Sequence, residues 1–217
     1  GSKDALHITD YIFSTMFREA VITSALLAKE KGPYPNYKPC VYDSTIVKNH
    51  FSNEEIAELR ECGLRNCSLL SIAPNGSLAT LLGESGGCEP EFAISYTRRT
   101  VGMTDGEDTY YQVYCKAARE YLDKTGEKEL PSYFISSAEI DPHNRVLTQA
   151  CMQNHVDTAI SSTVNLPNSA TKEDIAKIYL DAWKNGLKGI TIFRDGCKRL
   201  GILTTSNSNT EHILERG

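Results

Sequence analysis

"LLSIAPNGSLATLLGESGGCEPEF", residues 69–92, runs from an apolar stretch through Pro-Asn-Gly-Ser into a loop with three more glycines. The apolar run over residues 66–73 predicts a fully buried strand. In α/β folds, ligands gather at the carboxyl ends of strands. A strand-to-helix turn also exposes backbone N–H groups where the helix dipole favours an anion. The turn therefore predicts a phosphate site, with N–H donors from residues 75–79 and the Ser77 hydroxyl as a further donor.

An ordinary strand-to-helix turn is the alternative interpretation of the same residues. The stretch lacks the Gly-Lys-Ser/Thr of a P-loop, and it also lacks the GxGxxG pattern of dinucleotide-binding folds. Composition alone therefore leaves both interpretations open.

Helices and strands alternate along the rest of the chain. Apolar residues at helical spacing predict one long amphipathic helix over residues 6–29. Capping signals predict three more helices, which follow Ser52, Asp141 and Thr171. The remaining predicted elements are a helix over 108–122 and strands over 93–99, 158–166 and 188–194. This alternation favours an α/β fold with a mainly parallel sheet or barrel.

Composition and charge narrow the class of protein. The chain has 217 residues, 40% of them apolar, and a formal net charge of −5. No block of Lys and Arg with interleaved aromatics suggests nucleic acid as a partner. No apolar run reaches the roughly 18 residues of a membrane span, and no signal-peptide pattern opens the chain. We therefore expect a cytoplasmic protein with no membrane partner.

The chain divides into three parts on composition. Residues 1–2, Gly-Ser without Met, are typical of a scar left by tag removal. Residues 3–200 are predicted to form a single α/β domain. Residues 201–217 are polar and without periodicity, which predicts a flexible tail.

Cysteine and histidine spacing gives no metal site. The seven cysteines show neither CxxC spacing nor His partners, which argues against a disulfide framework and against zinc. Cys62 and Cys67 are either a pair or two inert thiols. His143 and His155 would need a converging third ligand to bind a metal.

Three segments resemble the catalytic subunits of ribonucleotide reductases and occur in that family's order. Residues 63–99 are similar to the stretch with the phosphate-binding loop and the Gly-hydrophobic-Glu-Pro segment after it. Residues 155–167, "HVDTAISSTVNLP", resemble the next hallmark, and residues 182–199 resemble the last barrel strand. The resemblance is closest to the adenosylcobalamin-dependent class. It implies the later part of a ten-stranded α/β barrel, in which a thiyl radical starts the reduction of a ribonucleotide's 2′-hydroxyl.

The resemblance also implies the site residues. The family's substrate phosphate contacts map onto Pro74, Asn75, Gly76, Ser77, Leu78 and Ala79. The family commonly has Thr at the position of Asn75 and often Ser at that of Ala79, so two hydroxyl donors are missing here. The next segment, which resembles an active-site wall and is alternatively a structural turn, comprises Gly87, Cys88, Glu89 and Pro90.

The expected radical chemistry follows from two comparisons with the family. Iron-dependent members carry two adjacent tyrosines in the last strand, whereas residues 191–193 are Thr-Ile-Phe, which favours adenosylcobalamin as the cofactor. The family's radical cysteine lies in an Asn-x-Cys-x-Glu pattern, and this sequence has none. The chain is therefore expected to contain no catalytic residue and to be inactive alone.

Two functions from different classes stay open. The first is a segment of a reductase that makes deoxyribonucleotides for DNA replication, acting on a ribonucleoside di- or triphosphate with the rest of the reductase chain as partner. The second is a stand-alone, non-catalytic relative that binds a nucleotide or a partner protein. For this chain taken alone, a sheet edge left unpaired where the missing half of the barrel should pair predicts self-association into a homo-oligomer.

Overall fold

The computed structural model describes residues 1–101 and 108–197, which form two compact units. The first unit consists of residues 1–73, 141–162 and 171–191. The second consists of residues 74–140, 163–170 and those from 192 onward. Among the described residues, no helix is both long and apolar enough to span a membrane. The tail predicted over 201–217 lies outside the described residues.

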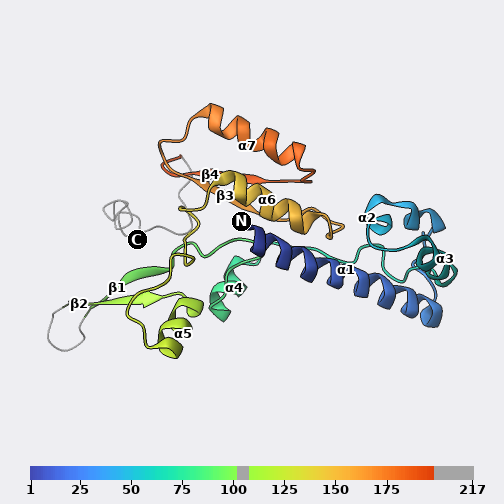
Figure 1. Cartoon of the computed structure of the whole chain (residues 1–217), viewed down its shortest axis with the longest axis horizontal. Coiled ribbons are helices and arrows are strands. Elements are labelled where there is room, and N and C mark those ends of the chain that lie inside the picture. Colours follow the sequence, from blue (N-terminus) through green and yellow to red (C-terminus); the bar gives the residue numbers. More distant parts are fainter. Residues whose placement is uncertain (102–107, 198–217) are drawn as a thin grey trace. The chain divides into compact units, whose positions relative to one another are not determined.

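Helix α1, Lys3–Lys31, is the long helix that the apolar spacing predicts (Figure 1). The Ser2 side chain caps it by accepting a hydrogen bond from the Ala5 N–H. Gly32 ends it with a φ of +80°, a conformation that other residues rarely adopt. Its inner face is formed by the buried residues Phe17, Val21, Ser24, Ala25 and Ala28.

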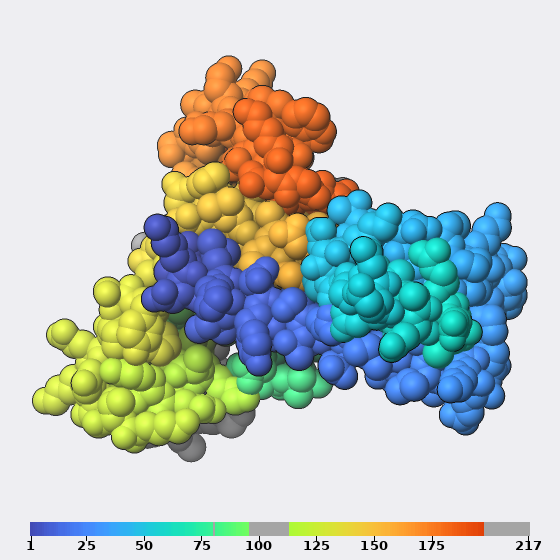
Figure 2. Space-filling model, turned by 45° about the vertical axis from the view of Figure 1, so that its right-hand side comes forward, coloured from blue at the N-terminus to red at the C-terminus, as the bar shows by residue number. Residues whose placement is uncertain are grey.

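The main hydrophobic core of the first unit joins α1 to three short helices. These are η1 (Pro39–Asp43), α2 (Thr45–Lys48) and α3 (Asn53–Cys62). Figure 2 shows them in lighter blue and cyan, packed as one mass with the carboxyl-terminal half of α1. The predicted capping box of α3 is confirmed between Ser52 and Glu55. The core consists of Phe17, Val21, Tyr42, Val47, Phe51, Ile56 and Leu64.

Helices α6 (Pro142–Gln153) and α7 (Lys172–Lys184) complete the first unit. Both begin at the predicted caps, Asp141 and Thr171, and α6 contacts both α1 and α7. The buried face of α6 is partly polar. Its Arg145, Gln149 and Gln153 donate side-chain hydrogen bonds to Ser162 Oγ, to the Gly189 carbonyl, and to the carbonyls of Val156 and Thr158.

Residues 66–73 do not form the predicted buried strand. Only Ile72 pairs, through a parallel bridge with Ile160. Leu69, Leu70 and Ile72 are half-buried, and the other five residues are exposed: Asn66, Cys67, Ser68, Ser71 and Ala73. The prediction was wrong because apolar composition is a local signal, whereas a strand needs a neighbouring backbone. Here the side chains of Asp157 and Thr158 bond the backbone of Leu69 and Leu70 instead.

The second unit begins with helix α4, Gly76–Leu82, and continues into a β-hairpin. Strands β1 (Ser95–Val101) and β2 (Asp108–Tyr114) pair antiparallel, and helix α5 (Lys116–Thr125) follows. The strand predicted over 93–99 is confirmed in β1, but the helix predicted over 108–122 is wrong in its first half. The run "TYYQVY" is rich in residues that favour strands, and pairing with β1 decides its conformation.

Strands β3 (Thr163–Leu166) and β4 (Thr191–Arg194) form a second sheet and confirm the last two predicted strands. The Thr191 N–H bonds the Ser162 carbonyl, and the Asp195 N–H bonds the Leu166 carbonyl. Because these bonds advance in the same direction along both strands, the pair is parallel. The described residues thus contain α/β elements with two two-stranded sheets, one of them antiparallel, and they do not form a closed barrel.

Candidate functional site

The turn that the sequence singles out lies at the start of α4. Pro74, Asn75, Gly76, Ser77 and Leu78 are all exposed. The Ala79 N–H donates to the Asn75 carbonyl at 2.9 Å, which is the first helical hydrogen bond, and the Ala79 side chain is buried. The Ala79 donor is therefore already used. Ser77 and Leu78 lie in the first turn of α4, where an N–H group has no acceptor within its own helix.

Gly86 brings the next loop against this turn. A Cβ atom at Gly86 would lie 3.4 Å from Asn75 Oδ1 and 3.6 Å from the Gly76 Cα. The Glu84 N–H also donates to the Ala79 carbonyl at 3.0 Å. The structure therefore brings residues 74–79 together with the start of the Gly87–Pro90 segment.

The Gly87–Pro90 segment is a turn tied to β3. The Glu89 N–H donates to the Gly86 carbonyl at 2.9 Å, and Gly87 has a φ of +57°. Cys88 is buried, and Glu89 Oε1 accepts the Thr163 N–H at 2.7 Å. One carboxylate oxygen of Glu89 is thus engaged in holding the start of β3. These contacts fit the structural-turn interpretation, and the active-site wall stays a prediction.

The described charges near the turn are mostly acidic. Burial raises the pKa of Glu91, and the charge of Glu84 raises it further. Lys116, at the start of α5, is paired with Glu84 through its Nζ, and this hydrogen bond raises the pKa of Lys116. An anion at the turn would therefore depend on N–H and hydroxyl donors more than on these charged side chains.

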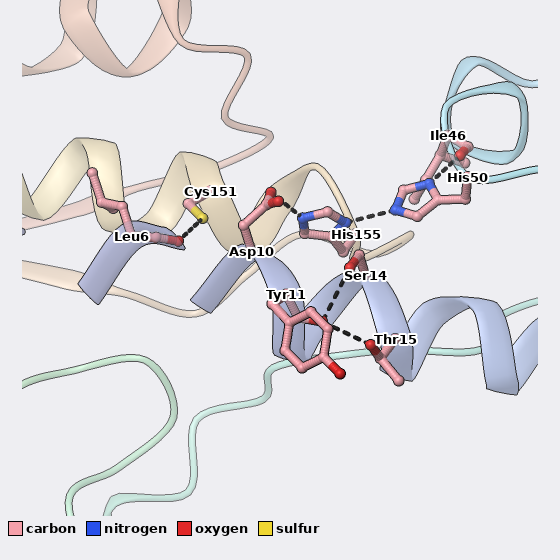
Figure 3. Close-up of polar contacts among 9 residues, drawn as sticks. All are labelled: Leu6, Asp10, Tyr11, Ser14, Thr15, Ile46, His50, Cys151 and His155. Atoms are coloured by element: carbon pink, nitrogen blue, oxygen red, sulfur yellow. Dashed lines mark hydrogen bonds and ion pairs between the residues drawn. The ribbon is translucent and has the colours of Figure 1, made fainter. Parts of the chain in front are cut away.

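A second polar cluster lies in the first unit, where Asp10 of α1, His155 after α6 and His50 after α2 form a chain (Figure 3). His155 is 5% exposed. Its Nε2 lies 2.9 Å from Asp10 Oδ1, and its Nδ1 lies 2.6 Å from His50 Nε2. The other ring nitrogen of His50, Nδ1, lies 2.6 Å from the Ile46 carbonyl oxygen.

The partners of these rings determine where their hydrogens lie. The Ile46 carbonyl only accepts, so His50 Nδ1 carries a hydrogen, and the Asp10 carboxylate requires one on His155 Nε2. A single hydrogen fits between the two facing nitrogens. Burial lowers the pKa of His50, and the neighbouring His155 and Arg18 lower it further, which favours the neutral form of the His50 ring.

The weaker candidates from the sequence behave as follows. Within residues 1–101 and 108–197, no His, Cys, Asp or Glu cluster has the geometry of a metal site. His143 Nδ1 bonds Asp181 Oδ2 at 2.6 Å. This contact joins α6 to α7 and involves none of the residues of the Asp10–His155–His50 chain. Cys62 and Cys67 are both free thiols.

The Asp10–His155–His50 chain was not predicted, since Asp10 and His155 are 145 residues apart and no local signal connects them.

Strands β3 and β4 pair in parallel, as neighbouring strands of an α/β barrel do, and the three motifs follow one another in a fixed order along the chain. The chain belongs to the ribonucleotide reductase barrel-domain family, whose model matches residues 1–193. The family predicted from the three motifs is thus confirmed.

Two reductases of known name are similar to this chain in sequence. The chain is 27% identical to the vitamin B12-dependent ribonucleoside-diphosphate reductase of Thermoplasma acidophilum, over 100% of this chain and 28% of that protein. It is 31% identical to the enzyme of the same name from Mycobacterium tuberculosis (strain CDC 1551), over 94% of this chain and 30% of that protein. The chain thus spans less than a third of the length of these two relatives.

A solved structure supports the fold. The alpha subunit of the Actinobacillus ureae class Id ribonucleotide reductase matches with a TM-score of 0.62 and 20% identity. The match covers 90% of this chain and 35% of that subunit. At this identity the likeness concerns the fold alone.

Proposed function

We propose that this chain is part of the barrel of an adenosylcobalamin-dependent ribonucleoside-diphosphate reductase, which converts ribonucleotides to deoxyribonucleotides by radical chemistry. The observation that carries the proposal is the family match over residues 1–193, together with relatives named as vitamin B12-dependent reductases. The partner of this chain is then the rest of the reductase. The alternative, a stand-alone module, predicts a short reading frame without an upstream Asn-x-Cys-x-Glu, so the length of the gene decides between them.

Within that enzyme, residues 74–79 bind the phosphate of the ribonucleotide. The exposure of residues 74–78 and the helical position of Ser77 and Leu78 support this role. The donors are the Ser77 and Leu78 N–H groups and the Ser77 hydroxyl, while Ala79 keeps its bond to Asn75. Replacing Ser77 by Ala is expected to weaken binding by about 1 kcal/mol, the typical net value of one hydrogen bond.

Gly76→Ala is the sharper test of the phosphate site. A Cβ atom at Gly76 meets nothing within 4 Å, so the substitution adds a methyl group to the turn without a clash in the fold. Gly189→Ala is the matched control, because its added Cβ also meets nothing within 4 Å. We expect Gly76→Ala to weaken the binding of a nucleoside diphosphate in calorimetry on the complete enzyme, and Gly189→Ala to leave it unchanged. Equal affinity in all three proteins would refute the phosphate site.

The cofactor is assigned to the complete enzyme and not to this chain. When bound, adenosylcobalamin supplies the radical that starts the reaction. Both ring nitrogens of His50 and of His155 are engaged, with one another, the Ile46 carbonyl and Asp10, so these two rings do not fit as cobalt ligands. We therefore place no cofactor contact on them.

A further inference from the structure

The segment that leads into the phosphate-binding turn has an unusual backbone arrangement. Residues 66–73 form neither a helix nor a regular strand, and only Ile72 pairs, through its bridge with Ile160. Backbone N–H and C=O groups without partners destabilise a fold wherever they are shielded from water. Leu69 and Leu70 are half-buried, so their backbone groups need partners from elsewhere in the unit.

Asp157 provides those partners with a single carboxylate. Its Oδ2 accepts the Leu69 N–H at 2.7 Å, and its Oδ1 accepts the Leu70 N–H at 3.0 Å. Thr158 continues the arrangement, since its hydroxyl donates to the Leu70 carbonyl at 3.1 Å. The Ser161 N–H then donates to the Ile72 carbonyl at 2.9 Å. Two side chains and one backbone bond thus replace the missing strand ladder.

The backbone around Asp157 is held from the other side. Lys188 Nζ donates to the Asp157 carbonyl at 2.7 Å. Gln153, a buried residue of α6, donates to the carbonyls of Val156 and Thr158 at 2.8 Å each. Asp157 therefore connects a backbone fixed to α6 with Leu69 and Leu70, which lie in the stem (residues 66–73) that leads to the turn.

We propose that Asp157 is a positioning residue for substrate binding, because its carboxylate fixes the stem at Leu69 and Leu70 from which the chain enters the turn at Pro74. This inference rests on the proposed function. A carboxylate suits the task because it accepts at both oxygens, and hydrogen bonds to a charged acceptor are the stronger kind. An amide of the same shape would present an NH2 group to one of the two N–H donors.

Asp157→Asn tests the role with two readouts on the full chain. The first is hydrogen exchange at the Leu69 and Leu70 amides, which we expect to become at least tenfold faster. The second is the NMR shift of the Ser77 and Leu78 amides on titration with inorganic phosphate, from which we expect at least fivefold weaker binding. Asp181→Asn is the matched control: it removes the same charge from a residue that bonds His143 and Asn185. It should leave both readouts unchanged.

Thr158→Val covers the outcome in which Asp157→Asn does not fold. It removes only the hydroxyl bond to Leu70, so the same two effects are expected at smaller size. If the Asp157 and Thr158 variants bind phosphate as tightly as the wild type while Gly76→Ala binds it more weakly, the positioning role is overturned. The proposed function would then still stand. A wild-type chain that shows no phosphate response at Ser77 and Leu78 overturns both.

Discussion

Acidification should lower the free energy of unfolding of the protein, because His50 in the first unit resists protonation in the folded state. His50 Nε2 and His155 Nδ1 lie 2.6 Å apart, so there is room for a hydrogen on only one of these two facing nitrogens. Burial, the neighbouring His155 and Arg18 all lower the pKa of His50 below its ordinary value of 6.5, against opposing contributions from the Ile46 carbonyl and Asp10. Below pH 6.5 the unfolded chain therefore protonates His50 more readily than the folded chain does.

The direction and limit of this effect follow from proton linkage. Because the unfolded state binds more protons, the free energy of unfolding falls as pH drops below 6.5 and continues to fall until the folded pKa is passed. One proton changes stability by at most about 1.4 kcal/mol per pH unit. His50 is only partly buried, so solvent screening reduces the expected loss between pH 6.5 and 5 to on the order of 1 kcal/mol.

Urea unfolding of the wild type and of His50→Gln from pH 7.5 to 5 measures this loss. The Gln side chain can still form a hydrogen bond with His155 but does not titrate, so the unfolding free energy of this variant should vary less over this interval than that of the wild type. His143→Gln is the control, since His143 belongs to a separate pair with Asp181, and it should keep the wild-type pH dependence. Identical pH profiles for wild type and His50→Gln would refute this role of His50. Carboxylates with lowered pKa, such as Glu55 and Asp174, titrate below this interval.

Two further substitutions test the scaffold of the first unit. Ser52→Ala removes the cap of α3 and should lower the free energy of unfolding by about 1 kcal/mol, measured by urea denaturation; no change would show that the capping box contributes nothing. Tyr42→Phe removes the hydroxyl that donates to the Gly63 carbonyl at 3.0 Å and leaves that carbonyl unpaired in the core, so a loss of about 1–3 kcal/mol is expected in the same assay. A Tyr42→Phe variant as stable as the wild type would mean that water replaces the lost donor.

The helices could be predicted from the sequence because their signals are local. Ser52 with Glu55 and Thr171 with Asp174 are capping boxes within four residues, and the Asp141 side chain caps α6 by accepting the His143 N–H. Strand conformation depends on partners that are distant in sequence. The run at 108–114 therefore pairs as β2 against β1, although tyrosine spacing also fits a helix.

The candidate site was partly predictable for the same reason. The turn at 74–79 is a local pattern, and the structure places it at the start of a helix as expected. Two features changed its interpretation: Ala79 already donates to Asn75, and Glu89 is engaged with Thr163. Contacts of this kind depend on the folded chain, so neither spacing nor composition reveals them.

The "HVDT" run, residues 155–158, shows why a motif can be recognisable without carrying chemistry. His155 bonds Asp10 of α1 and His50, while Asp157 and Thr158 bond the backbone of Leu69 and Leu70. Val156 between them is completely buried, and its carbonyl accepts from Gln153. His155 thus ties α1 and His50 to the end of α6, while Asp157 and Thr158 both tie Leu69 and Leu70 to it, and all three do so through polar atoms. Replacing any of these three by an apolar residue would leave its partners unpaired, so residue identity here is fixed by the hydrogen-bonding needs of segments far away in the sequence.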